Sequence, residues 1–192
     1  FIAKAEKALG ANISVLTGKE EARYAALGVS AGIPGADGLA GDLGGGSLEL
    51  IDIKDGKLRD GVTLPLGPLR LIDLSGGSIE KAQEIVDESF AKAEILKNLK
   101  GRTFYAVGGT WRNLAKLHMA QMRYPLHVLH CYRMSRQQAM SLSGLVSNLS
   151  ASSLKEIREV SKSRSDTMPF GALVLERLLA HSQPTSVEVS VY

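Results

Sequence analysis

The chain has 192 residues, 44% of them hydrophobic and 22% charged, which is typical of a soluble globular domain with its own core. Its formal net charge of +3 suits an anionic ligand, but aromatic residues make up only 5% and no basic stripe interleaves with them, so we expect no nucleic-acid partner. No apolar run is long enough to cross a bilayer and the single cysteine, Cys131, cannot form an internal disulfide, so we expect no membrane partner and a cytoplasmic location.

The N-terminal segment begins without methionine and is typical of a helix that leads into a short strand over residues 11–17. A second helix is predicted over residues 19–32, where small apolar residues recur on one face. The chain closes on an alternating strand, "TSVEVSVY", with nothing after it. These two ends indicate an excised domain rather than a whole protein.

The next segment predicts three antiparallel strands joined by tight turns, over residues 39–43, 47–53 and 58–64. The second turn contains Asp55-Gly56, a dipeptide that strongly favours a hairpin. The sequence therefore predicts a three-stranded meander.

Helices and strands alternate through the rest of the chain. A helix over residues 78–99, with Ser78 as its cap, follows a short helical stretch in "GPLRLIDLS". Further elements are a strand in "RTFYAVGGT", helices at 110–122, 135–149, 152–160 and 166–181, and a strand at 185–192. Together they predict one α/β domain over residues 1–192, with a five-stranded mixed sheet and helices on both faces.

The stretch "GDLGGGSLEL", residues 41–50, allows two interpretations. Gly44, Gly45 and Gly46 could form only a hairpin turn that uses positive φ. Alternatively, their bare backbone N–H groups form an anion site for phosphate. Asp42 and Glu49 flank the loop, and two carboxylates beside a phosphate favour a bridging cation such as Mg²⁺. A hairpin tip can serve both purposes.

Three motifs in order resemble one family. The stretch from "GDLGGGSLEL" to "GPLRL" resembles the second phosphate motif of the exopolyphosphatase/guanosine pentaphosphate phosphatase (Ppx/GppA) family, in the actin-like ATPase superfamily. "VLTGKEEARYAALGV" is similar to the segment before that motif, and "FYAVGGTWRNLAKL" to a later Gly-Gly turn into a helix. The likeness covers essentially the whole chain and implies an RNase H-like fold, as the second domain of such a phosphatase.

The resemblance also implies residue roles. Glu21 corresponds to the catalytic carboxylate that orients and deprotonates the attacking water, Asp42 to a metal-binding acid, and Glu49 to an acid linked to both metal and water. It further implies a Mg²⁺ or Mn²⁺ cofactor and release of terminal phosphate from polyphosphate or guanosine pentaphosphate. The phosphate-binding positions that it implies are Gly44, Gly45, Gly46 and Ser47 in the loop, and Gly108, Gly109 and Thr110 in the later turn.

One departure from the family is large. Its first domain carries an Asp-x-Gly-Ser-x-Ser loop that grips the other side of the phosphate, and its C-terminal part continues with a Gly-x-Arg-Glu-Gly stretch, but neither occurs here. We therefore expect the missing N-terminal domain to be a partner of this one, and the isolated fragment to be inactive. A homodimer of the full-length protein is left open.

A second function stays open beside the phosphatase. A nucleotide-binding ATPase or sugar-kinase-like module would use "AVGGT" to hold adenosine. Bulky Trp111 and Arg112 follow that turn directly, where a purine needs room, and this favours the phosphatase.

Several other residues are of types that can bind ligands or metals. Tyr105 and Trp111 are typical of packing rather than ligand stacking. His127 and His130 have a metal-like spacing but no third ligand nearby, and Cys131 lacks a partner base, so their roles stay open. Three cations could line a polyanion path, although a solvated helix face is the commoner explanation of such a pattern: Arg158, Lys162 and Arg164.

Overall fold

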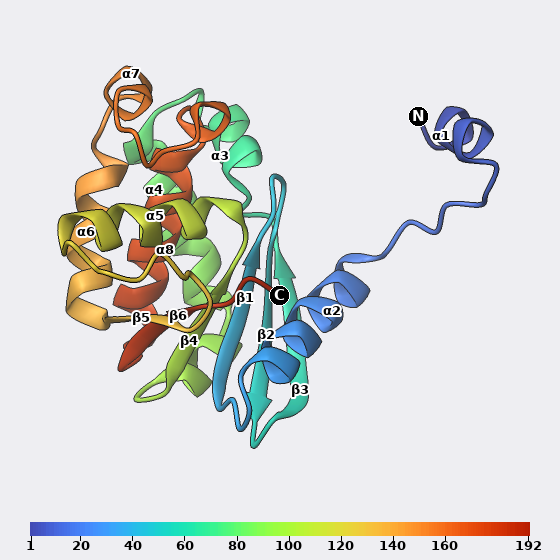
Figure 1. Cartoon of the computed structure of the whole chain (residues 1–192), viewed down its shortest axis with the longest axis horizontal. Coiled ribbons are helices and arrows are strands. Elements are labelled where there is room, and N and C mark those ends of the chain that lie inside the picture. The colour runs from blue at the N-terminus through green and yellow to red at the C-terminus, as the bar shows by residue number, and fades with distance from the viewer.

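The computed structural model describes residues 1–192 and shows an α/β fold built on one mixed sheet (Figure 1). The strands are β1 (Gly38–Leu43), β2 (Leu48–Lys54), β3 (Lys57–Leu64), β4 (Thr103–Val107), β5 (Tyr132–Ser135) and β6 (Ser186–Val189). The α-helices are α1 (Ile2–Leu9), α2 (Gly18–Gly32), α3 (Pro68–Ser75), α4 (Ile79–Lys92), α5 (Gly109–Gln121), α6 (Arg136–Ser147), α7 (Ala151–Lys155) and α8 (Met168–Ser182). The 3₁₀ helices are η1 (Glu94–Leu99) and η2 (Lys162–Arg164).

The strand order in the sheet is β3-β2-β1-β4-β6-β5. The first three strands pair antiparallel, which confirms the predicted meander. Strands β4 and β6 continue the sheet in parallel with β1, and β5 closes it antiparallel to β6. The register places Asp42 of β1 directly opposite Glu49 of β2, so both side chains leave the same face of the sheet.

The sheet has six strands, so the predicted count of five was wrong. The extra strand, β5, has only four residues and exists because it pairs with β6, a contact distant in sequence. The predicted strand over residues 11–17 is absent. That segment extends away from the body with α1 (Figure 1), and a strand needs a neighbour to supply its hydrogen bonds.

The helices match the predictions in place but not always in length. The predicted helix over residues 78–99 stops at Lys92 and resumes as η1, because the backbone leaves helical geometry at Ala93. The predicted helix over residues 152–160 ends at Lys155. None of the helices combines the length and the apolar character that crossing a bilayer requires.

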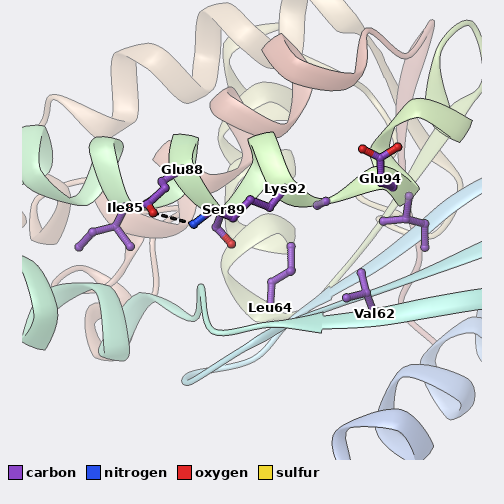
Figure 2. Close-up of a pocket in the computed structure, with 9 residues that line it drawn as sticks. Val62, Leu64, Ile85, Glu88, Ser89, Lys92 and Glu94 are labelled. Atoms are coloured by element: carbon purple, nitrogen blue, oxygen red, sulfur yellow. Dashed lines mark hydrogen bonds and ion pairs between the residues drawn. The ribbon is translucent and has the colours of Figure 1, made fainter.

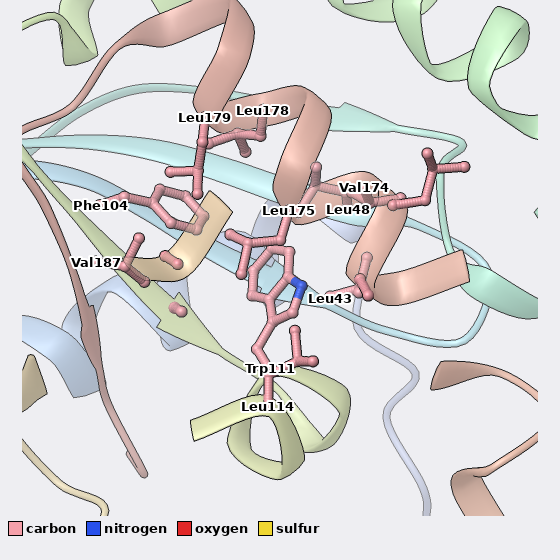
Figure 3. Packing of buried hydrophobic residues seen from close by; sticks show 14 of the residues in the cluster. Leu43, Leu48, Phe104, Trp111, Leu114, Val174, Leu175, Leu178, Leu179 and Val187 are labelled. Atoms are coloured by element: carbon pink, nitrogen blue, oxygen red, sulfur yellow. The ribbon is translucent and has the colours of Figure 1, made fainter. Parts of the chain in front are cut away.

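Two hydrophobic cores of unequal size lie on the two sides of the sheet. The larger side is covered by α3, α4, α5, α6 and α8, while α2 alone packs on the other (Figure 1). Figure 3 shows Trp111 of α5 and Phe104 of β4 packed against the leucines of α8. Helices on both faces were predicted and are confirmed. The smaller core, formed by Ala22, Ala26 and Val29 of α2 against the sheet, holds the helix that carries Glu21.

Candidate active site

Two glycine motifs meet where the parallel strands β1 and β4 end. Asp42 lies beside Val107 in the sheet, so the loop after β1 and the turn after β4 are neighbours. Gly108 has a φ of 107°, and a Cβ built there would lie 2.7 Å from the carbonyl oxygen of Leu43 and 3.2 Å from Oδ1 of Asp42. Only glycine fits this position. Ligands of open α/β sheets bind at such carboxyl ends of strands.

A cleft of about 460 Å³ opens at this junction. Its lining includes seven of the residues predicted from the sequence: Glu21, Asp42, Gly44, Gly45, Gly108, Gly109 and Thr110. Three predicted residues do not line it, since Gly46 and Ser47 lie further along the loop and Glu49 is buried beneath it, 2% exposed. Segments far apart in the sequence therefore converge on one site.

The glycine loop is not a turn of the positive-φ kind. None of Gly44, Gly45 and Gly46 has a positive φ, so that part of the hairpin interpretation was wrong. The backbone N–H groups of Gly45, Gly46 and Ser47 donate no hydrogen bond to any other group of the chain, and a Cβ at Gly46 would meet nothing within 4 Å. The loop thus presents free donors over bare backbone, as an anion site requires.

The first turn of α3 holds this loop in place. Gly67 packs so closely on Gly45 and Gly46 that an added Cβ would overlap their backbone. The N–H of Leu69 donates to the carbonyl oxygen of Gly45 at 3.0 Å. Pro68 at the start of the helix lacks an N–H and fixes its own φ, which suits a helix entry. The loop is therefore preorganised by contacts outside its own sequence.

Three carboxylates gather on the α2 side of the loop. Burial raises the pKa of Asp42, and the Glu21 carboxylate raises it further while Arg112 opposes the shift. The pKa of Glu49 is also raised, by burial first and then by Glu21 and Asp42, with the Ser47 side chain acting in the opposite sense. Both pKa values are raised for the same two reasons: burial removes water from the carboxylate, and neighbouring negative charges repel it.

The donor set fits a divalent cation that is completed by substrate and water. Both carboxylate oxygens of Glu49 are buried without a hydrogen-bond partner, which is costly for a polar group unless a ligand satisfies it. No group of three or more His, Cys, Asp or Glu side chains is arranged to hold a metal ion by itself. Mg²⁺ commonly needs only one or two carboxylates beside phosphate oxygens and waters. Asp42 and Glu49 are the residues that would hold it.

The cleft also includes residues outside the predicted set. Ser163, Arg164 and Thr167 approach from η2 and the turn before α8, and the Arg164 guanidinium lies against Gly109, where a Cβ would overlap it. From the sequence, Arg164 was only one of three cations that could line a polyanion path. Of the other two, Arg158 lines a different pocket and Lys162 does not line this cleft. Tertiary contact with the Gly-Gly turn distinguishes Arg164 from them.

Trp111 does not occupy the cleft. Its side chain is 1% exposed, its ring packs edge-on against Phe104 at 5.4 Å, and its Nε1–H donates to the carbonyl oxygen of Gly171 at 2.9 Å. The packing role is confirmed, but the argument that Trp111 blocks a purine was wrong, because the side chain turns into the core. Tyr105 is likewise buried in packing, and its hydroxyl accepts the N–H of Asp37.

The remaining candidates lie away from the cleft. His130 approaches the carbonyl oxygen of Gly32 through Nε2 at 3.0 Å, and its ring contacts Tyr192. His127 is exposed and lines a separate pocket, and Cys131 is an exposed free thiol. None of the three contributes to the candidate active site.

The meander, the parallel strands and the glycine loop at their carboxyl ends define a domain with the RNase H-like fold of the actin-like ATPases. The sequence matches the Ppx/GppA phosphatase family over residues 1–192. The chain belongs to that family.

Solved structures agree with this fold. A Ppx/GppA family member from Aquifex aeolicus is similar, with a TM-score of 0.79 and 24% sequence identity, and this chain covers 64% of its length. An exopolyphosphatase from Cytophaga hutchinsonii is similar with a TM-score of 0.87 and 22% identity, and 65% of it is covered. In both comparisons 100% of the present chain is matched. The chain thus spans about two thirds of the solved relatives.

Proposed function

We propose that this chain is the second domain of a phosphohydrolase that releases terminal orthophosphate from inorganic polyphosphate, guanosine pentaphosphate or both. The observation that carries the proposal is the single cleft in which Glu21, Asp42 and the two glycine motifs converge. Phosphoryl transfer depends on in-line positioning and on neutralisation of charge more than on covalent chemistry. The cleft offers groups for both tasks.

Each lining group has a distinct task in the proposed reaction. The free N–H groups of the loop hold the oxygens of the terminal phosphate, and Arg164 neutralises charge beside the Gly108-Gly109 turn. Glu21, exposed at the mouth, orients the attacking water and accepts its proton. Mg²⁺ or Mn²⁺, held by Asp42 and Glu49, would supply Lewis-acid stabilisation of the phosphate oxygens.

The site needs a second wall. The glycine loop, the metal-binding acids and the base lie in an open cleft, and this chain covers only 64% of the length of a solved relative. We propose that the N-terminal domain of the full-length protein closes the cleft, and that the 192-residue chain alone turns over slowly or not at all.

The nucleotide-binding ATPase or sugar-kinase-like module stays as a weaker alternative. Because Trp111 turns into the core, steric exclusion of a purine no longer counts against it. Membership of a phosphatase family favours hydrolysis of phosphoanhydrides instead.

Release of orthophosphate by the full-length protein tests the proposal. Colorimetric phosphate measurement with polyphosphate, guanosine pentaphosphate and ATP, each with and without Mg²⁺, compares the candidates side by side. We expect Mg²⁺-dependent release from polyphosphate or guanosine pentaphosphate that exceeds release from ATP. Preference for ATP, or release that is indifferent to Mg²⁺, would reject the proposal.

A further inference from the structure

A second cleft, of about 530 Å³, lies between α2 and the edge strand β3. Lys19 and Arg23 line it from the first turns of α2, and Arg59 lines it from β3. Its apolar floor includes Ala22 and Ile51. The cleft holds none of the residues assigned to the active site.

The three cations in this cleft are unpaired. Lys19, Arg23 and Arg59 form no ion pair, although the carboxylate of Asp60 lies in the same lining. The cleft therefore carries a net charge of about +2, which attracts an anion and repels a cation.

The groove on the other side of the same edge strand carries a different charge. A groove of about 520 Å³ lies between α4 and β3, and Lys92 pairs there with Glu88 at 2.7 Å. Figure 2 shows Lys92 pointing toward Glu88. Glu94 adds a second carboxylate to that groove. The two grooves flank the same edge strand, yet only the cleft on the α2 side has free positive charge.

A β-bulge shapes the cationic cleft. Ile51 pairs with Gly61 and Ile53 with Leu58, so Arg59 and Asp60 together stand opposite a single residue of β2. Bulges of this kind redirect a side chain at the edge of a sheet. Gly61 leaves room for the Ile51 side chain, which an added Cβ would overlap. The bulge thus brings Arg59 to the cleft lined by the α2 cations.

The cleft adjoins the candidate active site across the N-terminus of α2. Lys19 and Arg23 are four residues apart and share one side of the helix, whereas Glu21 lies about 200° around the axis and lines the other cleft. In the sheet, Asp42, Glu49 and Thr63 stand in one cross-strand row, and Thr63 lines the cationic cleft. Two strand spacings, about 10 Å, separate the ends of that row.

We propose that the α2–β3 cleft binds internal phosphates of an inorganic polyphosphate chain while its terminal phosphate occupies the glycine loop. This inference rests on the proposed function and selects the inorganic chain within it. A polyanion with charge on every unit can contact both clefts at once. Guanosine pentaphosphate would bring a base, and the lining of the cleft contains no aromatic ring on which a base could stack.

The test measures binding to the full-length protein without divalent cations, so that no turnover intervenes. The triple variant Lys19→Gln/Arg23→Gln/Arg59→Gln is compared with Lys54→Gln/Lys57→Gln/Lys81→Gln, which removes the same charge from exposed positions outside both clefts. We expect the first variant to weaken binding of long-chain polyphosphate by about tenfold or more, with a shallower salt dependence. Pyrophosphate affinity should change by less than about twofold, because pyrophosphate cannot span both clefts.

The outcomes separate the inference from the function on which it rests. Equal weakening in both triple variants would overturn the inference, because the net charge of the protein would then account for chain binding. No weakening in either variant would also overturn it, because the cleft would then not bind the chain. Arg59→Gln alone, on the edge strand, should weaken long-chain binding by about twofold and serves if the triple variant misfolds. If the wild-type protein released no phosphate but the Lys19/Arg23/Arg59 variant still lost chain binding selectively, the proposed function would fail and the binding cleft would stand.

Discussion

Adjacent glutamates on α2 have different environments. Glu20 completes a capping box, in which its carboxylate accepts hydrogen bonds from the N–H and hydroxyl of Thr17. The hydrogen bond from the Thr17 backbone lowers the pKa of Glu20. Glu21, about 100° further around the helix, lines the cleft instead. A single residue step thus separates a structural carboxylate from the proposed catalytic one.

Glu21→Gln in the full-length protein should lower kcat by about 10²- to 10⁴-fold while polyphosphate binding stays near wild type, because the amide keeps the shape but cannot accept the proton. Glu20→Gln should have little effect, since glutamine also completes a capping box. Steady-state kinetics of both variants make the comparison. The assignment would be withdrawn if the two substitutions proved equally mild.

Asp42→Ala should reduce activity more at subsaturating than at saturating Mg²⁺, because excess cation compensates for a lost ligand. Phosphate release across a Mg²⁺ titration measures the shift. A loss of the same size at every Mg²⁺ concentration would indicate a packing defect rather than a metal role.

At the scale of elements, the candidate site depends on where helices α3 and α5 begin relative to the ends of β1 and β4. The start of α3 supports the glycine loop through Gly67, and α5 begins at a Gly108 that no side chain caps. The N-terminus of α5 therefore directs free N–H groups and its positive dipole end toward the cleft. Both helices act on the proposed phosphate site through their first turns.

Gly67→Ala and Gly46→Ala should separate support of the loop from binding by the loop. A Cβ at Gly67 would overlap the loop backbone, so we expect a loss of about 1–3 kcal/mol in stability and a fall of about 10- to 100-fold in kcat/KM. A Cβ at Gly46 meets no atom of the protein, so the free energy of unfolding should not change. It would, however, crowd a phosphate bound to the free N–H groups of the loop, so phosphate affinity should fall. Thermal unfolding and kinetics distinguish the two. Unchanged phosphate release in Gly46→Ala would argue against the phosphate-loop assignment.

At the scale of the whole molecule, Arg102 connects several segments at the end of the sheet opposite the candidate active site. Its guanidinium donates to Asp37, to Asp52 at 2.7 Å, and to the carbonyl oxygens of Ile53 and Asn98. The side chain is 23% exposed, so these interactions are only partly screened by solvent. One residue thus links β2, β4, η1 and the segment before β1.

Arg102→Gln should lower the free energy of unfolding by about 2 kcal/mol, because Asp37 and Asp52 are left without a cationic partner in a half-buried setting. Lys97→Gln is the matched control, since it removes an ion pair whose partners are about 75% exposed, and should cost less than about 0.5 kcal/mol. Urea unfolding of the 192-residue chain compares them. Similar losses in both variants would contradict a linking role for Arg102.

Local patterns allowed much of the fold to be predicted. The meander followed from alternation and from Asp55-Gly56, and α2 from small apolar residues on one face, because these signals act between neighbours in the chain. Strand β5 was not predicted, because four residues show little periodicity and their pairing partner, β6, is distant in sequence. Residues 11–17 show the converse, since strand-like alternation forms no strand without a partner.

The residue types of the site could be chosen from the sequence by itself: the glycine loop, the flanking acids and the Gly-Gly turn each stand within one short segment. Only the tertiary structure decided which of them share a cleft, that Glu49 lies beneath it and Trp111 in the core, and that Arg164 and the α2–β3 cations belong nearby. The reason is physical. Motif chemistry is local, whereas burial, side-chain direction and convergence depend on how distant elements pack against one sheet.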